Sequence, residues 1–290
     1  MLGWRKLLRR ARAVSETVSE SARLDVSGRA VPLRIRRHRR ARRIVLRVDG
    51  ARDEAVLTLP WRVPLREGLA FAHERRDWLQ ARLAGLPPRV PFGPGAILPI
   101  RGEPHVIRHA PGRAVPPIGG RTTKSPRATN VAPLSGRGVV RVEAGEIRIA
   151  GKPEHLARRL AEWLRAEAGR VLAPLARDKA LRLGVAVGKI TVRDTRTLWG
   201  SCSASGDLSL CWRLVLAPPF VADYVCAHEV AHLKIRGHGA RFWRIVAELA
   251  EDMAGARAWL ARHGEGLQRY GRAGLTPRAI NDAPLPGRSN

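Results

Sequence analysis

The residues best suited to chemistry lie at positions 228–232, where the sequence is HEVAH. On a helix, His228 and His232 are four residues apart and project from one face, so both imidazoles can reach a single cation. Neutral imidazole is a preferred ligand of Zn²⁺. Glu229 follows the first histidine, where its carboxylate can hold a water at the metal without binding the metal itself. The spacing therefore predicts a zinc site with Glu229 as its base.

A third histidine, His238, follows six residues after His232. This gap lets the chain leave the helix and turn back toward the metal, and Gly237 suits a reversal because glycine adopts positive φ at low cost. Three protein ligands leave one coordination position for water, whereas a structural zinc is closed by a fourth ligand. We therefore expect a catalytic Zn²⁺ site formed by His228, His232 and His238.

The expected helix begins after Pro218 and carries both histidines on its apolar stripe. Val221, Val225, His228 and His232 recur at helical spacing, so they face the core together. A single histidine on such a stripe is usually a hydrogen-bonded core residue. Two buried imidazoles beside a carboxylate would cost several kcal/mol without a partner, and a metal removes that cost.

The remaining elements follow from the spacing of apolar residues. Alternation predicts strands at 31–49, 55–59, 96–99, 104–108, 139–142, 146–149, 189–193 and 207–213. Helical spacing predicts helices at about 64–83, from 152 to 183, after 218, from about 240, and around 259–260. Pro174 should kink or divide the long helix, and Gly184 should end it.

These elements predict an α+β chain with four parts. Residues 1–28 form a basic N-terminal extension, and residues 29–150 form a β-rich region with one helix. Within that region, 111–138 is rich in Pro, Gly, Ser, Thr and Arg and is expected to be a flexible insertion. Residues 151–268 form the metal-binding domain, and 269–290 form a disordered tail.

The chain is strongly basic, with a net charge of +28 and a pI near 11.7. Such an excess favours polyanions as partners but does not define a fold. The densest cluster of positive charge is a candidate phosphate-binding edge. Its members are Arg34, Arg36, Arg37, Arg39, Arg40, Arg42 and Arg43. A solvated hairpin tip is the alternative interpretation.

The three cysteines, Cys202, Cys211 and Cys226, include no C-x-x-C pair. They are typical of reduced thiols in a cytoplasmic protein, and Cys226 is expected to pack in the core. No apolar run approaches the roughly 20 residues that span a bilayer. We therefore expect a cytoplasmic chain without a transmembrane segment.

Several short motifs occur together near the expected metal site. They are WGSCS at 199–203, WRL at 212–214, AP at 217–218, YV at 224–225, HEVAHL at 228–233, His238, and FW at 242–243. This combination resembles the YgjP-like metallopeptidase domain, a family related to the SprT-like and WLM metallopeptidases and assigned a zincin-like fold. The resemblance extends over residues 30–265 without 111–138. Two departures stand out: the family commonly has Arg where this chain has Leu198, and Asn-His-Ser where it has Gly237-His238-Gly239.

The resemblance implies a zincin-like metallopeptidase domain, preceded by the β-rich N-terminal region. It implies His228, His232 and His238 as zinc ligands and Glu229 as the catalytic glutamate. In zincin-like folds a strand upstream of the metal helix often pairs with extended substrate, which here would be the strand at 207–213. The expected substrate contacts are Trp199, Gly200, Ser201, Leu210 and Trp212.

The predicted function is therefore hydrolysis of peptide bonds in a protein or peptide, through a zinc-activated water with Glu229 as general base. Two alternatives remain. The spacing H-x₃-H-x₅-H also occurs in metal-dependent RNases, so a basic chain could be a nuclease. A non-hydrolytic nucleic-acid-binding protein stabilised by zinc is the other.

Overall fold

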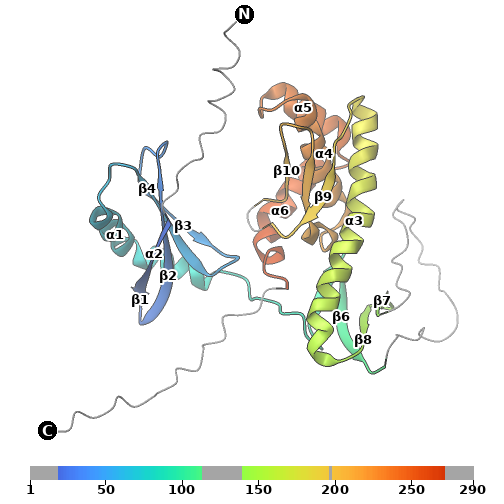
Figure 1. The fold of residues 1–290 in the computed structure, drawn as a ribbon, viewed down its shortest axis with the longest axis horizontal. Helices are drawn as coiled ribbons and strands as arrows, with labels where there is room; N and C mark the ends of the chain where they lie inside the picture. Colours follow the sequence, from blue (N-terminus) through green and yellow to red (C-terminus); the bar gives the residue numbers. More distant parts are fainter. Residues whose placement is uncertain (1–18, 113–138, 196–197, 272–290) are drawn as a thin grey trace, which may run out of the picture. The chain divides into compact units, whose positions relative to one another are not determined.

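The computed structural model describes residues 19–112, 139–195 and 198–271 (Figure 1). The chain divides into two compact units, residues 1–87 and 88–290. Most of the expected insertion at 111–138, most of the N-terminal extension and most of the C-terminal tail lie outside the described residues.

The N-terminal unit is a four-stranded mixed sheet with two helices. Its strands are β1 (Ser19–Val26), β2 (Arg29–His38), β3 (Val45–Asp49) and β4 (Glu54–Pro60), in the order β1-β2-β4-β3. The central pair β2–β4 is parallel, and the outer pairs are antiparallel. Leu33, Ile35 and Leu57 alternate along the strands into a core that also contains Ala72 and Leu79 of the helices.

Two details of this unit differ from the expectation. Strand β1 begins at Ser19, inside the segment assigned to the N-terminal extension. The helix expected at 64–83 is divided at Arg75 (φ −100°, ψ 15°) into α1 (Leu65–Glu74) and α2 (Arg76–Ala84). The buried residues are Gly68 and Ala72 in α1 and Leu79 in α2. Gly68 lies so close to the sheet that an added Cβ would be 2.5 Å from the Leu59 side chain.

The second unit begins with another four-stranded mixed sheet. Its strands are β5 (Ile97–Ile100), β6 (Glu103–Ala110), β7 (Val140–Glu143) and β8 (Glu146–Ala150), in the order β5-β6-β8-β7. The β-rich N-terminal region predicted at 29–150 includes these four strands. The structure packs Ile107 and Ile147 in the same hydrophobic cluster as the helices that follow, so this sheet belongs to the unit with the histidines.

The long helix α3 (Leu156–Leu183) follows the short 3₁₀ helix η2 (Pro153–His155) and connects the two sheets of this unit (Figure 1). It continues through Pro174, so the expectation that proline divides it is wrong. Pro174 is exposed while Leu164, Leu172 and Ala176 are buried along the helix. The proline ring therefore interrupts hydrogen bonding only on the solvent side, and packing holds the rest. The helix ends at Gly184 in the left-handed conformation (φ 68°), as predicted.

The third sheet supports the candidate site. It contains β9 (Ile190–Arg193), β10 (Gly200–Cys202) and β11 (Leu208–Cys211), in the order β10-β11-β9. Strand β11 is followed by the 3₁₀ helix η3 (Trp212–Val215) and by the helices α4 (Pro219–Lys234), α5 (Ala240–Leu249) and α6 (Met253–Leu267). In the part of the chain that is described, no helix has the length and apolar character needed to cross a membrane.

Candidate metal centre

Helix α4 is fixed from behind by a buried ion pair. Lys179 of α3 is 1% exposed, and its Nζ lies 2.5 Å from Oδ1 of Asp223. The same ammonium donates to the carbonyl of Leu249 (2.8 Å), and Oδ2 of Asp223 accepts the backbone N–H of Glu251 (2.7 Å). Both buried charges thus have polar partners, which buried charges require. The pair joins α3, α4 and the end of α5, and it positions the segment that carries His228.

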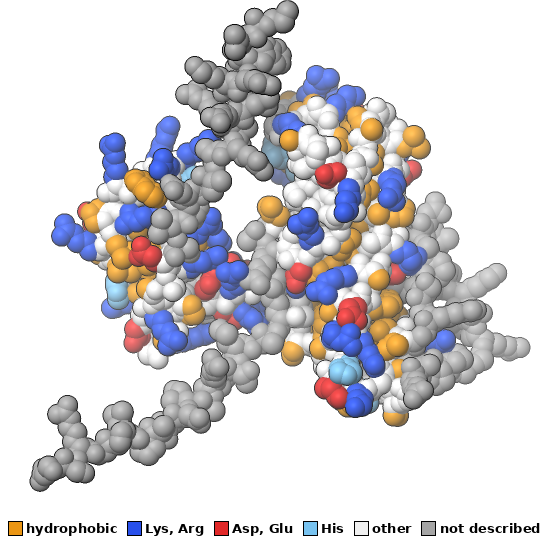
Figure 2. All heavy atoms as spheres, in the orientation of Figure 1, with side chains coloured by type: hydrophobic (Ala, Val, Ile, Leu, Met, Phe, Trp, Pro, Cys, Tyr) orange, Lys and Arg blue, Asp and Glu red, His pale blue; other side chains and the backbone are white. Residues whose placement is uncertain are grey.

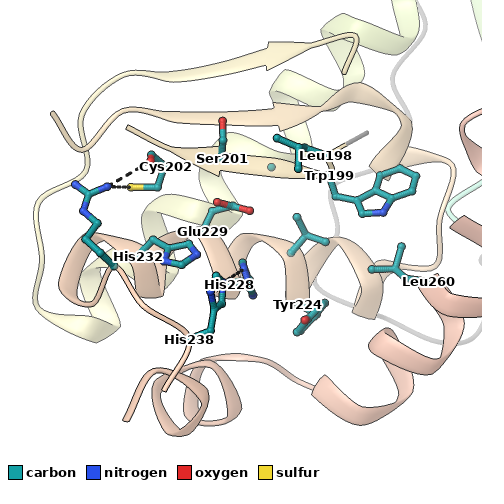
Figure 3. Close-up of a pocket in the computed structure, with 13 residues that line it drawn as sticks. Leu198, Trp199, Ser201, Cys202, Tyr224, His228, Glu229, His232, His238 and Leu260 are labelled. Atoms are coloured by element: carbon teal, nitrogen blue, oxygen red, sulfur yellow. Dashed lines mark hydrogen bonds between the residues drawn. The ribbon is translucent and has the colours of Figure 1, made fainter. Parts of the chain in front are cut away.

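The three histidines predicted as ligands converge at one point (Figure 3). Their candidate ligand atoms all lie within 4.8 Å of one another, and Nε2 of His238 is 3.3 Å from Nε2 of His228. Two nitrogens bound to one tetrahedral zinc at about 2.05 Å would be about 3.3 Å apart. The donor set therefore fits a zinc ion, and the His228–His238 pair has the expected spacing.

The turn that returns His238 to the other two histidines forms without the expected glycine conformation. Helix α4 ends at Ile235 in an extended conformation (φ −137°, ψ 120°), and Gly237 is not among the residues with positive φ. The reversal thus comes from the extended residue at the helix end. The expectation of a positive φ at Gly237 is wrong, although the loop does bring His238 to the site.

The immediate surroundings favour the neutral imidazoles that a metal needs. Nδ1 of His232 lies 3.1 Å from the carbonyl of Ile235. Donation from Nδ1 to that oxygen leaves the lone pair on Nε2, the nitrogen available to a metal. Burial, and then the charges of His232 and His238, lower the pKa of His228 to about 4. Burial also lowers the pKa of His232.

Glu229 is buried beside the histidines, and no described residue is its polar partner. Its side chain is 6% exposed, and burial raises its pKa to about 7. Among the described residues, none forms a hydrogen bond or ion pair with its carboxyl group. The carboxyl group lies against Gly200, where an added Cβ would be 2.6 Å from Oε1. A buried acid of this kind marks a functional site more often than a structural one.

The histidines and Glu229 line a cavity of about 540 Å³ (Figure 3). Strand β10 and the residues before it form one wall, α4 and the following loop form the floor, and α6 contributes a side chain. The lining residues are Leu198, Trp199, Gly200, Ser201, Cys202, Tyr224, Val225, His228, Glu229, His232, Arg236, His238 and Leu260.

Three of the five expected substrate contacts, Trp199, Gly200 and Ser201, lie in this wall. The other two, Leu210 and Trp212, do not line the cavity; they are 0% and 3% exposed in the core. Strand β11 is paired on both edges, with β10 and with β9. It has no edge left for a peptide, so the expected pairing of substrate with the strand at 207–213 is wrong.

Strand β10 is the edge strand beside the cavity. On the side that faces β11, the carbonyl of Trp199 accepts the N–H of Cys211, and the N–H of Ser203 donates to the carbonyl of Asp207. By the alternation of an antiparallel ladder, Gly200 and Cys202 direct theirs to the opposite edge. The carbonyl of Cys202 accepts a hydrogen bond there from Arg236 (3.3 Å).

Six further residues line the cavity without having been predicted at the site: Leu198, Cys202, Tyr224, Val225, Arg236 and Leu260. Tyr224 and Val225 could have been found, because they precede His228 by about one helical turn and project from the same side of α4. Leu260 comes from α6 and gives no local signal. Cys226 is fully buried, as expected, and burial raises its pKa to about 12. All three cysteines are free thiols.

The arginine cluster of the N-terminal unit divides into engaged and exposed members. Arg34 forms ion pairs with Asp49 (3.4 Å) and Glu54 (2.7 Å). Arg37 donates to the carbonyls of Trp61 (3.1 Å) and Val63 (2.8 Å). Arg36 is half-buried, Arg39, Arg40, Arg42 and Arg43 are exposed, and the guanidinium of Arg39 lies 5.3 Å from the centre of the Trp61 ring. Figure 2 shows cationic side chains at many points of this unit's surface. At least two of the seven arginines therefore stabilise their own unit.

A known family model matches most of the chain. The model described as "YgjP-like, metallopeptidase domain" matches residues 42–263, a segment that contains the three histidines, Glu229 and the cavity wall. Comparisons with curated proteins and with solved structures found no match. The match confirms the family expected from the motifs at 199–243.

Proposed function

Because the chain belongs to the YgjP-like metallopeptidase domain family, we propose that the cavity beside α4 is its active site and hydrolyses peptide bonds with Zn²⁺ held by His228, His232 and His238. One observation carries the proposal. The buried carboxyl group of Glu229 has no polar partner of its own among the described residues, and it lines the same cavity as three imidazoles whose candidate ligand atoms lie within 4.8 Å of one another.

Zinc, when bound, supplies positive charge that polarises a water molecule and the carbonyl of the scissile bond. Glu229 accepts the proton of that water and passes it to the nitrogen of the leaving amine. Burial raises the pKa of Glu229 to about 7 in the metal-free chain, and the charge of a bound zinc would lower that pKa and favour the carboxylate, which is the form that accepts a proton. Gly200 leaves the space in which the carboxyl group lies.

The chain's own residues also orient the substrate. The outward N–H and C=O of Gly200 lie on the open edge of β10, where an extended peptide can add as a strand. Such pairing would hold the peptide along the cavity wall, opposite the floor that carries Glu229 and His228. Hydrogen bonds from a fixed backbone position a peptide whatever its side chains are, so selectivity must come from elsewhere in the cavity.

The nuclease alternative is less well supported by this cavity. Apart from histidines, Arg236 is the sole cationic side chain among the lining residues. Proteins that bind a nucleic-acid strand normally follow its backbone with several Lys or Arg residues and stack its bases on aromatic rings. Nucleic-acid binding by the exposed arginines at 39–43 stays a prediction, as does the cytoplasmic location.

A substrate-class experiment tests the proposal. Zinc-loaded protein is incubated with casein, with labelled single-stranded DNA and with labelled RNA, each with and without a chelator. We expect cleavage of casein that stops with chelation and returns with added zinc, and we expect intact nucleic acids. Cleavage of DNA or RNA with intact casein would contradict the proposal and support the nuclease alternative.

A further inference from the structure

The cavity has two chemically different ends, with the histidines and Glu229 between them. Figure 3 shows Cys202 at one end and Leu198, Trp199 and Leu260 at the other. Arg236 contacts the backbone of Cys202 at the first end. A peptide bond placed over Glu229 would therefore have its neighbouring side chains in unlike surroundings.

The apolar end is built from three elements. Trp199 packs on Gly264 of α6, where an added Cβ would be 3.3 Å from ring atom Cζ2. Leu260 lies one turn earlier on the same helix, and Val225 contributes from α4. Leu198 is 57% exposed beside them, so part of its apolar surface remains available to a ligand. This end suits a large apolar side chain.

The cationic end is built around Arg236. Its guanidinium donates to the carbonyls of Cys202 (3.3 Å) and Ala204 (3.2 Å), which fix its position at the end of β10. It forms no ion pair with the described acidic residues. A guanidinium has five N–H donors, so others remain for a carboxylate. Because the Arg236 guanidinium is exposed, is fixed by two carbonyls and has no described acidic partner, this end of the cavity suits an acidic side chain of a substrate.

The direction of β10 orders these two preferences along a substrate. The strand runs from Gly200 to Cys202, that is, from the apolar end toward Arg236. Antiparallel pairing is the more stable kind, so a peptide added to this edge would run from the Arg236 end to the Trp199 end. Its residue before the scissile bond would approach Arg236, and its residue after the bond would enter the apolar end.

We propose that the site selects peptides with an acidic residue just before the scissile bond and a large apolar residue just after it. The inference rests on the proposed peptidase function. Arg236 is the specificity-determining residue for the acidic side chain, and Leu260 with Trp199 determines the apolar preference.

Four quenched fluorescent peptides that differ at these two positions test the proposal. The central pairs are Glu-Leu, Leu-Glu, Lys-Leu and Glu-Gly. We expect kcat/KM for Glu-Leu to exceed that of each other peptide by roughly tenfold or more, with cleavage between Glu and Leu. Equal cleavage of Glu-Leu and the reversed Leu-Glu peptide would overturn the proposal.

Two variants assign each preference to its end. Arg236→Glu should favour Lys-Leu over Glu-Leu and keep the preference for Leu over Gly. Leu260→Ala should lose the preference for Leu and keep the preference for Glu over Lys. Arg236→Gln, which retains amide donors for the two carbonyls, should abolish discrimination between Glu and Lys without reversing it. An unchanged charge preference in both Arg236 variants would overturn the assignment.

A binding measurement separates this inference from the proposed function. Glu229→Gln protein is titrated with the four peptides, and binding is followed by fluorescence anisotropy. Tighter binding of Glu-Leu without turnover by the wild type would support the specificity and contradict the peptidase function. Turnover with equal binding and equal kcat/KM for all four peptides would do the reverse.

Discussion

Two carboxylates on helix α4, Asp223 and Glu229, are buried in very different ways. Asp223 faces Lys179 and also accepts the N–H of Glu251, so its charge is balanced within the fold. Glu229 lies six residues later, is more deeply buried (6% exposed against 14% for Asp223), and has no polar partner among the described residues. One buried charge therefore stabilises the helix, and the other is kept by that helix in an unfavourable environment.

Charged residues with a structural role and those with a functional role differ in this chain in their polar partners. A buried charge with partners contributes to the position of its helix, whereas a buried carboxyl group without partners retains its capacity to bind a proton and a ligand. Two arginines differ in a related way: Arg34 forms ion pairs with Asp49 and Glu54, whereas Arg236 donates to backbone carbonyls and forms no ion pair with the described acidic residues. Residue type alone does not make the distinction. The contacts do.

The largest expected effect comes from removing the unpartnered carboxylate. Glu229→Gln keeps the shape of the side chain but removes its basicity, so kcat should fall by about 10²–10⁴. Zinc content, measured by atomic absorption, should remain that of the wild type because Glu229 is not a proposed ligand. Retained peptidase activity in this variant would show that Glu229 is not the base.

The partnered carboxylate should respond in the opposite way. Lys179→Met leaves Asp223 buried without its cation, so the free energy of unfolding should fall by about 3–5 kcal/mol. Urea titrations followed by circular dichroism measure the change. In the double variant Lys179→Met/Asp223→Asn the charge is gone, and we expect part of the loss to be recovered. Equal stabilities of wild type and Lys179→Met would contradict a structural role for the pair.

The pH dependence of stability gives a third, smaller effect in the metal-free protein. Folding raises the pKa of Glu229 from 4.5 to about 7, so between these values the folded state binds more protons than the unfolded state. The free energy of unfolding should therefore fall as pH rises through this range, by on the order of 3 kcal/mol relative to Glu229→Gln. The lowered pKa of His228 acts in the opposite direction in both proteins and largely cancels in the difference. Parallel pH profiles of the two proteins would rule out the shift.

The smallest effect concerns the space around Glu229. In Gly200→Ala the new Cβ would meet the Glu229 side chain at 2.5–2.7 Å, so the carboxyl group must move. A displaced base should lower kcat by roughly ten- to a hundredfold while zinc binding persists. Gly169→Ala on α3 is the matched control, since an added Cβ there would have no atom within 4 Å and Gly169 does not line the cavity, so this variant should retain its activity.

Local patterns in the sequence predicted the histidine cluster, the fold class and the family. His228 and His232 converge because residues four apart share a helix face, and the α+β class follows from alternating and helical spacing. Family membership followed from the motifs at 199–243. The end of α3 at Gly184 could be predicted because it depends on the left-handed backbone conformation of one residue, which glycine adopts readily.

The features that sequence reasoning missed depend on distant partners. Nothing within residues 207–213 indicates that β11 is the central strand, since this depends on the positions of β9 and β10. Pro174 is tolerated because packing along α3 holds the helix on both sides of it. The sheet β5–β8 joined the second unit through its packing against α3, a contact that no window of sequence contains.

The central claim is that His228, His232 and His238 hold one zinc ion, and metal analysis of the purified chain tests it most directly. Wild-type protein, His238→Ala and the control His73→Ala, altered at an exposed histidine of the other unit, are equilibrated with zinc and dialysed. We predict one zinc ion per chain in the wild type and in His73→Ala, and loss of most zinc in His238→Ala. A wild-type protein without zinc, or a His238→Ala variant that binds it equally well, would contradict the account.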